Sequence, residues 1–182
     1  MNDWEKPSLE YIDEQARNGD VATLQPTLYH PEIYTGSGID AMSILLQMYS
    51  RPNPQVHTGP VDNDCPLILC DLTLPDTPII YASEAFTLLT GYTYPEIRGR
   101  NCRFLQSPPK AKASFKRSSE DRAALKQIRQ AVRDNRECQV QVVNYRKNGT
   151  KFLNYLTIIP VRWNSNEFNY SVGLQQGVAE LG

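Results

Sequence analysis

The last third of the chain most constrains the fold, because three strand patterns follow one another there with only short turns between them. Residues 137–146 (ECQVQVVNYR) alternate apolar and polar side chains, and residues 151–162 (KFLNYLTIIPVR) and 168–176 (FNYSVGLQQ) are rich in strand-forming residues. The connecting segments KNGT and NSNE are turn sequences that join antiparallel neighbours. This region therefore predicts three consecutive antiparallel strands.

Two further strands are expected upstream. Residues 65–72 (CPLILCDL) and 77–83 (TPIIYAS) have the apolar, β-branched composition of strands, and Pro75 and Asp76 supply a turn between them. Between the two strand groups the patterns change to helical. Three helices are therefore expected to separate two strands from three.

The helix boundaries are marked by capping residues. Residues 83–92 (SEAFTLLTGY) predict a short helix with Ser83 as its N-cap and Gly91 as its stop. Thr93 and Glu96 have capping-box spacing and begin a second helical segment that continues toward residue 105. A third helix is expected from residue 118 or 119 to about 134, with Leu125, Ile128 and Val132 as its buried stripe. The element order predicts an α+β domain with a five-stranded antiparallel sheet and helices on one face.

The N-terminal part differs in composition. Residues 1–36 are polar and contain three prolines, which predicts a flexible arm. Residues 38–50 (GIDAMSILLQMYS) predict an amphipathic helix whose apolar stripe is Ile39, Met42, Leu46 and Tyr49. Residues 51–64 (RPNPQVHTGPVDND), here called the latch, cannot be helical because of their prolines. The expected organisation is an arm (1–36), the cap helix with most of the latch (37–60), the sheet domain, which begins within the latch (61–178), and a short tail (179–182).

Composition excludes several classes of partner. The net charge of −1 gives no basic field for direct nucleic-acid binding, and no apolar run reaches the about 18 residues of a membrane span. The four cysteines, with no signal-peptide pattern ahead of them, are expected to be reduced thiols in the cytoplasm and nucleus. Their spacing includes no CxxC, and the chain has only two histidines, so no metal site is expected.

The segment GRNCRFLQ (99–106) resembles the signature of LOV domains, the blue-light-sensing branch of the PAS fold. YASEAFTLLTGY upstream and VVNYRKNGTKFLNYLTIIPV downstream extend the resemblance over about residues 61–176. The similarity continues through QMYSRPNPQVHTGPVD, so the chain resembles the short fungal photoreceptors of the Vivid and Envoy type. That resemblance implies a PAS/LOV fold with an N-terminal cap and no fused effector.

The resemblance also implies a photochemical cycle. A LOV domain binds a flavin noncovalently, and blue light causes a cysteine thiol to add to ring carbon C4a while N5 gains a proton. Here the matching cysteine is Cys102, which has no neighbouring histidine base. Gln175 matches the glutamine that senses N5, because an amide can present either oxygen or nitrogen. The cysteine is expected to be a neutral thiol in the dark, since a thiolate would react without light.

Further residues match flavin-binding positions of the family. Asn144 and Asn154 each lie among apolar residues on one face of a strand, which suits the pyrimidine edge of a flavin. Two alternatives stay open for these amides: exposure on the solvent face, or a hydrogen bond to each other. The complete expected set is Ile68, Cys70, Ile79, Asn101, Arg103, Gln106, Arg117, Ile128, Asn144, Asn154, Leu156, Ile158 and Gln175.

The loop after Gln106 bears on the identity of the flavin. It is about ten residues longer than in plant LOV domains, and it carries Lys110, Lys112, Lys116 and Arg117. A positive lid suits a second phosphate and an adenine, which favours FAD over FMN, although FMN beneath a solvated loop stays possible.

Two features bear on the reactivity of the pocket. Ile128 and Ile158 stand where Vivid-type proteins have methionine, which predicts faster return to the dark state. Cys70 shares its strand face with Ile68, so it is either a second, oxidation-sensitive thiol near the flavin or a small core residue.

The expected output is a changed surface, because the chain shows no kinase, zinc-finger or DNA-binding pattern. Repacking of the latch is expected to favour a homodimer on illumination and binding to the White Collar photoreceptor–transcription complex, in photoadaptation. No catalytic acid–base set is visible, so an enzyme such as a flavin oxidoreductase is not expected. A light-independent PAS interaction module and a flavin redox sensor remain alternatives.

Overall fold

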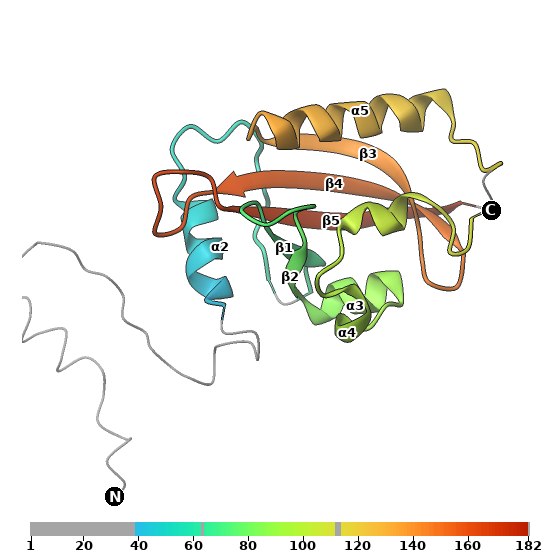
Figure 1. Ribbon diagram of the computed structural model, residues 1–182, viewed down its shortest axis with the longest axis horizontal. Helices are drawn as coiled ribbons and strands as arrows, with labels where there is room; N and C mark the ends of the chain where they lie inside the picture. Colours follow the sequence, from blue (N-terminus) through green and yellow to red (C-terminus); the bar gives the residue numbers. More distant parts are fainter. Residues whose placement is uncertain (1–38, 63, 112–113, 182) are drawn as a thin grey trace, which may run out of the picture. The chain divides into compact units, whose positions relative to one another are not determined.

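The computed structural model describes residues 39–62, 64–111 and 114–181 (Figure 1). The segment expected to be a flexible arm, residues 1–36, lies outside the described residues. No helix in the described ranges combines the length and apolar character needed to cross a membrane. The described part contains one sheet with helices on both of its faces.

The sheet has five antiparallel strands in the order β2-β1-β5-β4-β3, which confirms the predicted α+β class. The strands are β1 (Leu67–Asp71), β2 (Ile79–Ala82), β3 (Cys138–Tyr145), β4 (Lys151–Val161) and β5 (Tyr170–Leu181). β5 is longer than the sequence indicated, because Lys151 at the start of β4 pairs with Leu181. Residues 179–181, expected as a tail, are therefore strand.

The helices begin and end at the predicted caps. They are α2 (Ala41–Tyr49), α3 (Glu84–Thr90), α4 (Tyr94–Ile97), the 3-10 helix η2 (Cys102–Gln106) and α5 (Ser119–Arg133). The Ser83 hydroxyl accepts from the amide of Phe86, and Gly91 ends α3 in the left-handed region with φ 74°. The capping box of Thr93 and Glu96 forms as predicted. The segment after α4 is less regular than expected, since only the short η2 follows.

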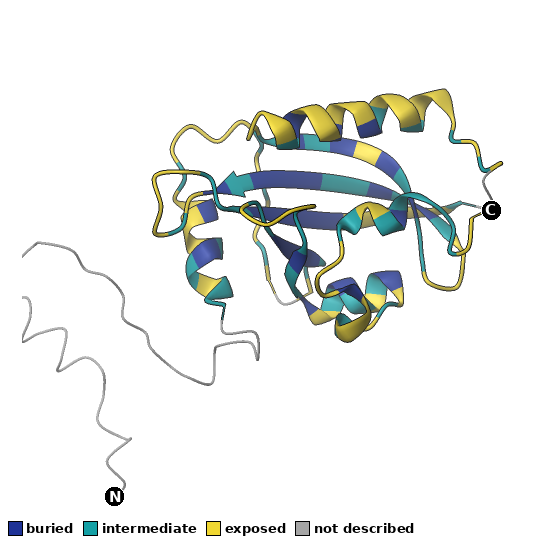
Figure 2. Ribbon diagram, viewed as in Figure 1, coloured by how far each residue is buried: buried dark blue, intermediate teal, exposed yellow. Residues whose placement is uncertain are grey.

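The two faces of the sheet carry different helices. Residues 67, 69, 159, 161, 172 and 174 pack with α2, whereas the alternate residues of the same strands face α5, α3, α4 and η2. Figure 2 shows the central strands as mostly buried and α5 as exposed on its outer side. In α5 the buried residues are Leu125, Ile128 and Ala131, while the expected Val132 is only half-buried. The face of the sheet that carries α5 is also the face on which the candidate functional site lies.

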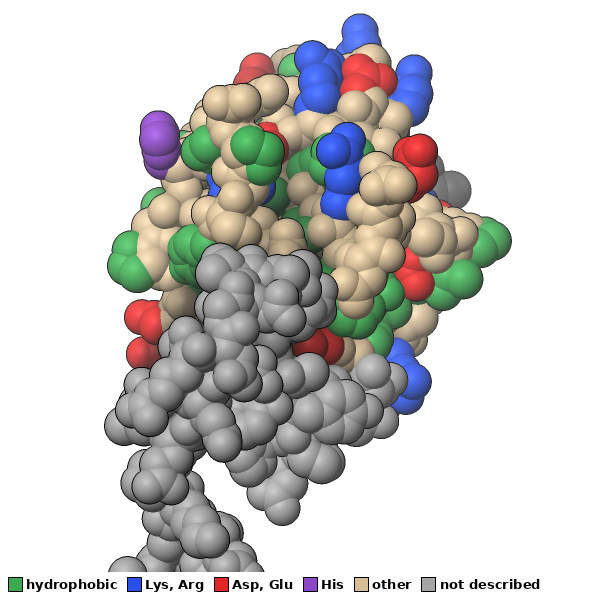
Figure 3. All heavy atoms as spheres, turned by 90° about the vertical axis from the view of Figure 1, so that its left-hand side faces the viewer, with side chains coloured by type: hydrophobic (Ala, Val, Ile, Leu, Met, Phe, Trp, Pro, Cys, Tyr) green, Lys and Arg blue, Asp and Glu red, His purple; other side chains and the backbone are tan. Residues whose placement is uncertain are grey.

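The predicted stripe of α2 is wrong. Ile44 and Met48 are the buried residues, whereas Met42, Leu46 and Tyr49 are 55%, 51% and 46% exposed. Apolar residues occur on more than one side of this helix at i, i+4 spacing, so the pattern alone did not select the face that packs. Figure 3 views the molecule from the side on which α2 lies, and hydrophobic side chains reach the surface there.

The latch contains no helix or strand in its described residues, as predicted, and a partly buried ion pair attaches it to the sheet. Arg51 Nε donates to Glu137 Oε1 at 2.6 Å, just before β3. Glu137 Oε2 accepts from the backbone amides of Gln55 (2.9 Å) and Val56 (2.7 Å). Arg51 also donates to the carbonyl oxygens of Met48 and Val56. The ion pair therefore connects the end of α2, the latch and β3.

Candidate functional site

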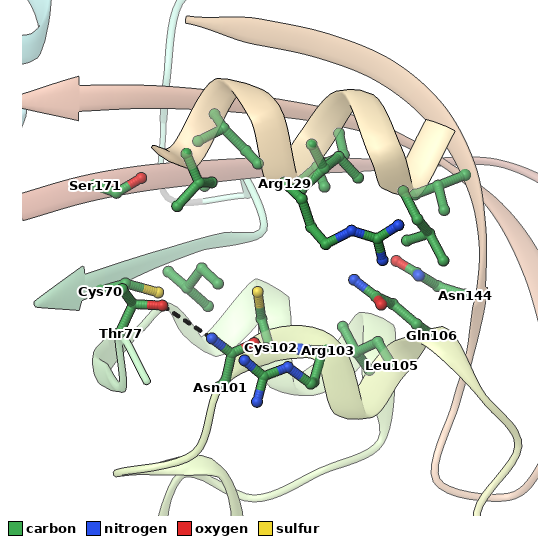
Figure 4. A pocket seen from close by; sticks show the side chains of 18 of the residues that line it. Cys70, Thr77, Asn101, Cys102, Arg103, Leu105, Gln106, Arg129, Asn144 and Ser171 are labelled. Carbon is green, nitrogen blue, oxygen red and sulfur yellow. Dashed lines mark hydrogen bonds between the residues drawn. The ribbon is translucent and has the colours of Figure 1, made fainter. Parts of the chain in front are cut away.

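A cavity of about 520 Å³ lies between the α5 side of the sheet, α5 and η2. Its volume is within the range of cofactor and ligand pockets, roughly 300–1,000 Å³. Figure 4 shows side chains from β1, β3, β5, η2 and α5 around it. All but one of the expected flavin-binding residues line this cavity: Ile68, Cys70, Asn101, Cys102, Arg103, Gln106, Arg117, Ile128, Asn144, Asn154, Leu156, Ile158 and Gln175.

The exception is Ile79, which does not line the cavity, so its contact with the flavin stays a prediction. Its side chain is fully buried in a core cluster with Phe86, Ile97 and Leu105, and it does not line the cavity. Ile79 pairs with Cys70 across β1 and β2, next to a bulge at Leu69 and Cys70. It therefore supports the cavity wall from behind, while Cys70 forms part of the wall.

Cys102 is the first residue of η2 and faces the cavity (Figure 4). Asn101 caps η2 by accepting from the amide of Arg103, and its own amide donates to Thr77 Oγ1 at 2.9 Å and to the carbonyl of Asp76 at 2.7 Å. These bonds fix the start of η2 against the turn between β1 and β2. The position of the Cys102 thiol is thus set by backbone and amide contacts.

The two cavity thiols have shifted pKa values in opposite directions. The interaction with the Cys102 thiol and burial raise the pKa of Cys70 well above its usual value. The interaction with Cys70, a bond to its own backbone amide and the charge of Arg103 lower the pKa of Cys102, although burial opposes this. Cys102 is therefore more easily ionised than the unactivated thiol that the sequence indicated, because its neighbour is a second thiol.

Three buried side-chain amides form the opposite part of the wall. Asn144, Asn154 and Gln175 are 4%, 1% and 4% exposed. Asn154 Nδ2 donates to Asn144 Oδ1 at 2.8 Å, and Asn154 Oδ1 accepts from the amide of Gln176 at 3.1 Å. Two of the arrangements expected for these asparagines therefore occur together, because both residues line the cavity and their side chains are hydrogen-bonded to each other. Solvent exposure is excluded.

The donor set fits the polar edge of a flavin. Asn144 Nδ2 donates to the carbonyl of Val143, and Gln175 Nε2 donates to that of Gly173 at 3.3 Å. Each amide nitrogen carries two protons, so each of these side chains keeps a second proton for a ligand. Gly173 also lines the cavity, and a Cβ there would lie 3.0 Å from Ile68 Cγ1. The absence of a side chain at residue 173 therefore keeps space for a flat ring.

The positive charge at the cavity comes mostly from arginines. Arg117 lines the cavity and donates to the carbonyl of Gln106 at 3.1 Å, and Arg129 and Arg133 of α5 line it as well. Of the loop lysines, Lys110 and Lys116 are exposed and do not line the cavity, and Lys112 lies outside the described residues. The expected positive lid is thus partly supplied by α5.

Arg103 lines the cavity at its outer edge. Its guanidinium is 59% exposed and pairs with Asp76, with Nη1 donating to Oδ2 at 2.8 Å. That ion pair lowers the pKa of Asp76. A phosphate at Arg103 would therefore share the guanidinium with a carboxylate.

Arg129 and Arg133 line the cavity but were not among the expected site residues. They follow Ile128 and Val132 directly, so the apolar stripe of α5 already indicated which side of the helix they adjoin. Leu72, Thr77, Leu105 and Ser171 were also missed. These four lie where the β1–β2 turn, η2 and β5 converge, which only the fold reveals.

The chain is similar to known light-receptor proteins over most of its length. Residues 64–178 match the PAS domain family. The light-state dimer structure of the fungal blue-light photoreceptor Vivid is 53% identical, with a TM-score of 0.71, and the match covers 82% of this chain and 99% of that one. The blue light receptor lreA of Aspergillus flavus is 45% identical over 85% of this chain. White collar 1 protein of Neurospora crassa is 42% identical over 81%.

The matched region is only 18% of the lreA sequence and 13% of white collar 1, so this chain spans a small part of those relatives. Vivid and lreA are named as light receptors, which supports a receptor rather than an enzyme. The high identity and near-complete coverage of Vivid extend beyond the PAS match toward the cap. The chain therefore belongs to the PAS domain family and, within it, to the fungal blue-light photoreceptors of the Vivid type.

Proposed function

We propose that this protein senses blue light through a flavin held in the 520 Å³ cavity, with Cys102 as the reacting thiol. The observation that carries the proposal is the joint placement of Cys102 and three buried amides on the wall of one cavity. A flavin that has absorbed blue light supplies an electrophilic ring carbon and a basic ring nitrogen. The chain supplies the sulfur, the proton and the polar contacts that orient the ring.

Each side chain then has a defined task. Cys102 provides its sulfur to the ring carbon and its proton to the ring nitrogen. Asn144 and Asn154 hold the ring edge with their free amide protons, while their mutual bond fixes their orientation. Gln175 reorients its amide when its ligand changes from acceptor to donor, because it can present oxygen instead of nitrogen. The site is thus both a binding site and a detector.

We propose FAD as the flavin. Arg117, Arg129 and Arg133 give the cavity three guanidinium groups beyond Arg103, and a guanidinium matches the geometry of a phosphate. One phosphate needs fewer cations than this set provides. A dinucleotide carries two phosphates and therefore suits the arginines better than FMN does.

A short backbone path links Gln175 to the latch. The amide of Gln175 donates to the carbonyl of Pro66 at 2.8 Å. The Ser83 hydroxyl donates to the carbonyl of Cys65 and accepts from the amide of Leu67, both at 3.0 Å. A movement of β5 at Gln175 thus acts directly on residues 65–67, where the latch ends. Repacking of the latch then shifts α2.

The proposed output is a change of partner. Vivid has a light-state dimer, and white collar 1 contains a region similar to this chain, so a homodimer on illumination and a White Collar-type complex are the partners that we propose. We propose that binding to such a complex modulates light-responsive transcription and thereby produces photoadaptation. We accordingly propose residence in both cytoplasm and nucleus, which fluorescence imaging of the tagged protein tests.

The absorption cycle of the flavin-loaded protein tests the proposal. Blue light is expected to bleach the flavin bands, and darkness to restore them. Cys102→Ala should bind flavin but not bleach, while Cys138→Ala, which alters a buried thiol outside the cavity wall, should bleach like the parent. Bleaching in Cys102→Ala, or a purified protein that retains no flavin, would refute the assignment.

A further inference from the structure

The loop that leads into α5 carries basic side chains that the proposed site does not fully use. Lys116 is exposed and does not line the cavity, whereas its neighbour Arg117 is half-buried and does line it. Two serines follow directly, so the chain reads Lys116-Arg117-Ser118-Ser119. Basic residues two and three positions before a serine are the pattern that basophilic protein kinases select, because their peptide-binding groove is acidic. The sequence therefore presents Ser119 as an acceptor for a phosphoryl group.

The local structure leaves this segment open to an enzyme. Residues 115–118 belong to no helix or strand, and Ser118, Ser119 and Glu120 are exposed at the start of α5 (Figure 2). Ser119 is the first residue of that helix, and its hydroxyl donates to the exposed carboxylate of Glu120 at 2.9 Å. A kinase binds its substrate as an extended peptide, so it must open the first turn of α5. Helix ends open at the lowest free-energy cost, and Ser119 lies at such an end.

Ser118 is the less suitable acceptor. Its hydroxyl caps α5 by accepting from the amide of Asp121 at 3.0 Å. The carboxylate of Asp121 in turn accepts from the amide of Val143 at 3.1 Å, which holds it against β3. A kinase that selects serines by the acidic residues after them would have to break both bonds to modify Ser118. Recognition of Ser119 through the exposed Lys116 requires neither change, so the structure favours Ser119.

Arg117 connects this serine to the cavity. It lines the cavity, its Nε donates to the carbonyl of Gln106 at 3.1 Å, and Arg122 Nη1 donates to the carbonyl of Arg117 at 3.0 Å. Two guanidinium groups therefore belong to residues two positions before and three positions after Ser119. A phosphoserine has a charge of about −1.5 to −2 at neutral pH and accepts strong hydrogen bonds from arginine. A phosphate on Ser119 would thus compete with a flavin phosphate for Arg117.

We propose that a basophilic protein kinase phosphorylates Ser119, and that the phosphate draws Arg117 away from the cavity and weakens the binding of FAD. The hydroxyl oxygen of Ser119 attacks the γ-phosphorus of ATP, the bond from that phosphorus to the bridging oxygen breaks, and ADP leaves. The hydroxyl proton passes to a base of the kinase. The helix dipole stabilises the new phosphate at the start of α5, while the carboxylates of Glu120 and Asp121 repel it toward the guanidinium groups.

The effect on the flavin rests on the proposed function, in which Arg117 contributes to binding the second phosphate of FAD. FMN lacks that phosphate, so its affinity should change much less when Arg117 is withdrawn. The competition also acts in the other direction, because a bound FAD phosphate makes Arg117 less available to the kinase. Phosphorylation of Ser119 would thereby set the fraction of the protein that carries its light-absorbing group.

The first experiment incubates the full chain with the catalytic subunit of cAMP-dependent protein kinase and MgATP, in excess FAD or in excess FMN, and locates the phosphate by mass spectrometry. We expect one phosphate, on Ser119, added more slowly in FAD than in FMN. Lys116→Gln should slow the reaction several-fold, because it removes the positive charge three positions before the serine. Lys110→Gln removes another exposed charge of the same loop and should be modified like the parent.

The second experiment titrates the fully phosphorylated apoprotein with each flavin. The affinity for FAD should fall roughly tenfold, the affinity for FMN should change much less, and phosphatase treatment should restore the affinity for FAD. Ser119→Ala should accept no phosphate and should bind FAD equally well before and after kinase treatment. Ser114→Ala removes another exposed serine of the loop and should behave like the parent in both experiments.

The outcomes separate this inference from the function itself. If the untreated protein binds no flavin, the proposed function fails, whereas mass spectrometry still reports on phosphorylation of Ser119. If the kinase adds no phosphate, or adds it to Ser114 or Ser118 instead, the inference is wrong. If Ser119 is phosphorylated but FAD binds as before, or FAD and FMN lose affinity equally, competition for Arg117 is contradicted.

Discussion

Ile158 and Ile159 are neighbours in β4 whose side chains lie on opposite faces of the sheet. Ile158 lines the cavity with Ile128, whereas Ile159 is fully buried against α2. We predict that Ile128→Met and Ile158→Met slow the return to the dark state several-fold, because a flexible, polarizable side chain packs more closely against a ring than a stiff β-branched one. Absorbance recovery after a light pulse measures this.

Ile159→Met makes the same chemical change on the other face, so it is the matched control and should leave the recovery rate unchanged. Faster or equal recovery in both cavity variants would contradict the proposed contact with the flavin. If Ile159→Met also slowed dark recovery, general loosening of the sheet would explain the effect of the cavity variants.

Substitution of Gly173 tests whether the cavity needs this space for the flavin ring. An added Cβ would lie 3.0 Å from Ile68 Cγ1, and both residues line the cavity, so Ile68 could yield only into the space proposed for the ring. Overpacking of this kind costs about 1–3 kcal/mol. We predict that Gly173→Ala lowers the flavin retained per protein molecule, measured by absorbance after purification. Gly59→Ala, where nothing lies within 4 Å of the added carbon, should retain as much flavin as the parent.

The arginines of α5 test the choice of flavin. Arg129→Gln combined with Arg133→Gln should weaken FAD binding by roughly tenfold or more, which corresponds to about 1.4 kcal/mol, and should change FMN binding much less. Lys126→Gln removes an exposed positive charge of the same helix away from the cavity and serves as the control. Equal losses for both flavins would contradict a second phosphate at these residues. Titration of apoprotein with each flavin measures the two affinities.

At the scale of elements, the ion pair of Arg51 and Glu137 decides whether the latch stays attached. The two side chains are only 13% and 11% exposed, and removing one partner of a fully buried pair costs about 3–5 kcal/mol. We predict that Glu137→Gln lowers the free energy of unfolding by less than this, because the pair is only partly buried, and that hydrogen exchange in residues 51–61 becomes faster. Urea unfolding and exchange mass spectrometry measure the two effects. Glu167→Gln, in an exposed loop, is the control and should change neither.

The same carboxyl predicts a pH dependence. Burial alone would raise the pKa of Glu137, but the bonds from Arg51 and from the amides of Val56 and Gln55 outweigh it and lower the pKa. A carboxyl with a lowered folded pKa stabilises fully above its unfolded value, about 4.3, and that stabilisation is lost as the pH falls through the folded value. The protection of the latch amides, corrected for the intrinsic exchange rate at each pH, should therefore fall in acid, and Glu137→Gln should remove much of that fall. An unchanged pH profile in the variant would contradict this role.

Capping residues predicted where helices begin and end, but the sequence did not predict which residues of a helix pack against the sheet. Ser83, Gly91, Thr93 and Glu96 act within a few residues of themselves, so their caps were readable from the sequence. The packing face of α2 was not, because several of its sides are apolar and the choice depends on the sheet it meets. The Arg51–Glu137 pair joins residues 86 positions apart, and no periodicity carries that information.

At the scale of the whole molecule, Gln175 and Gln176 allow a matched test of signalling. Gln175 is buried in the cavity wall, whereas Gln176 beside it is exposed. We predict that blue light raises the solution mass of the parent toward that of a dimer, and that Gln175→Leu reduces this change while still bleaching. Light scattering in darkness and under illumination measures the mass. Gln176→Leu should dimerise like the parent, and normal dimerisation of Gln175→Leu would contradict the relay.

The fold class and most of the cavity wall were predictable, because the GRNCRFLQ motif and the strand alternation each specify several positions at once. That Ile79 lies outside the cavity wall was not predictable, since β2 is short and the packing of its side chain depends on α4 and η2. The bond between Asn144 and Asn154 could be stated only as an alternative, because it needs the β3–β4 register. Sequence therefore indicated most residues of the cavity wall, and the fold supplied their contacts.

The central claim is that the sulfur of Cys102 bonds to a bound flavin only after light is absorbed. A crystal structure of the flavin-loaded protein, determined before and after blue illumination of the same crystal, tests it most directly. We predict separate density for the Cys102 sulfur and the ring in the dark, and continuous density between them in the light. A sulfur that stays separate from the ring in crystals whose flavin has bleached would contradict the account.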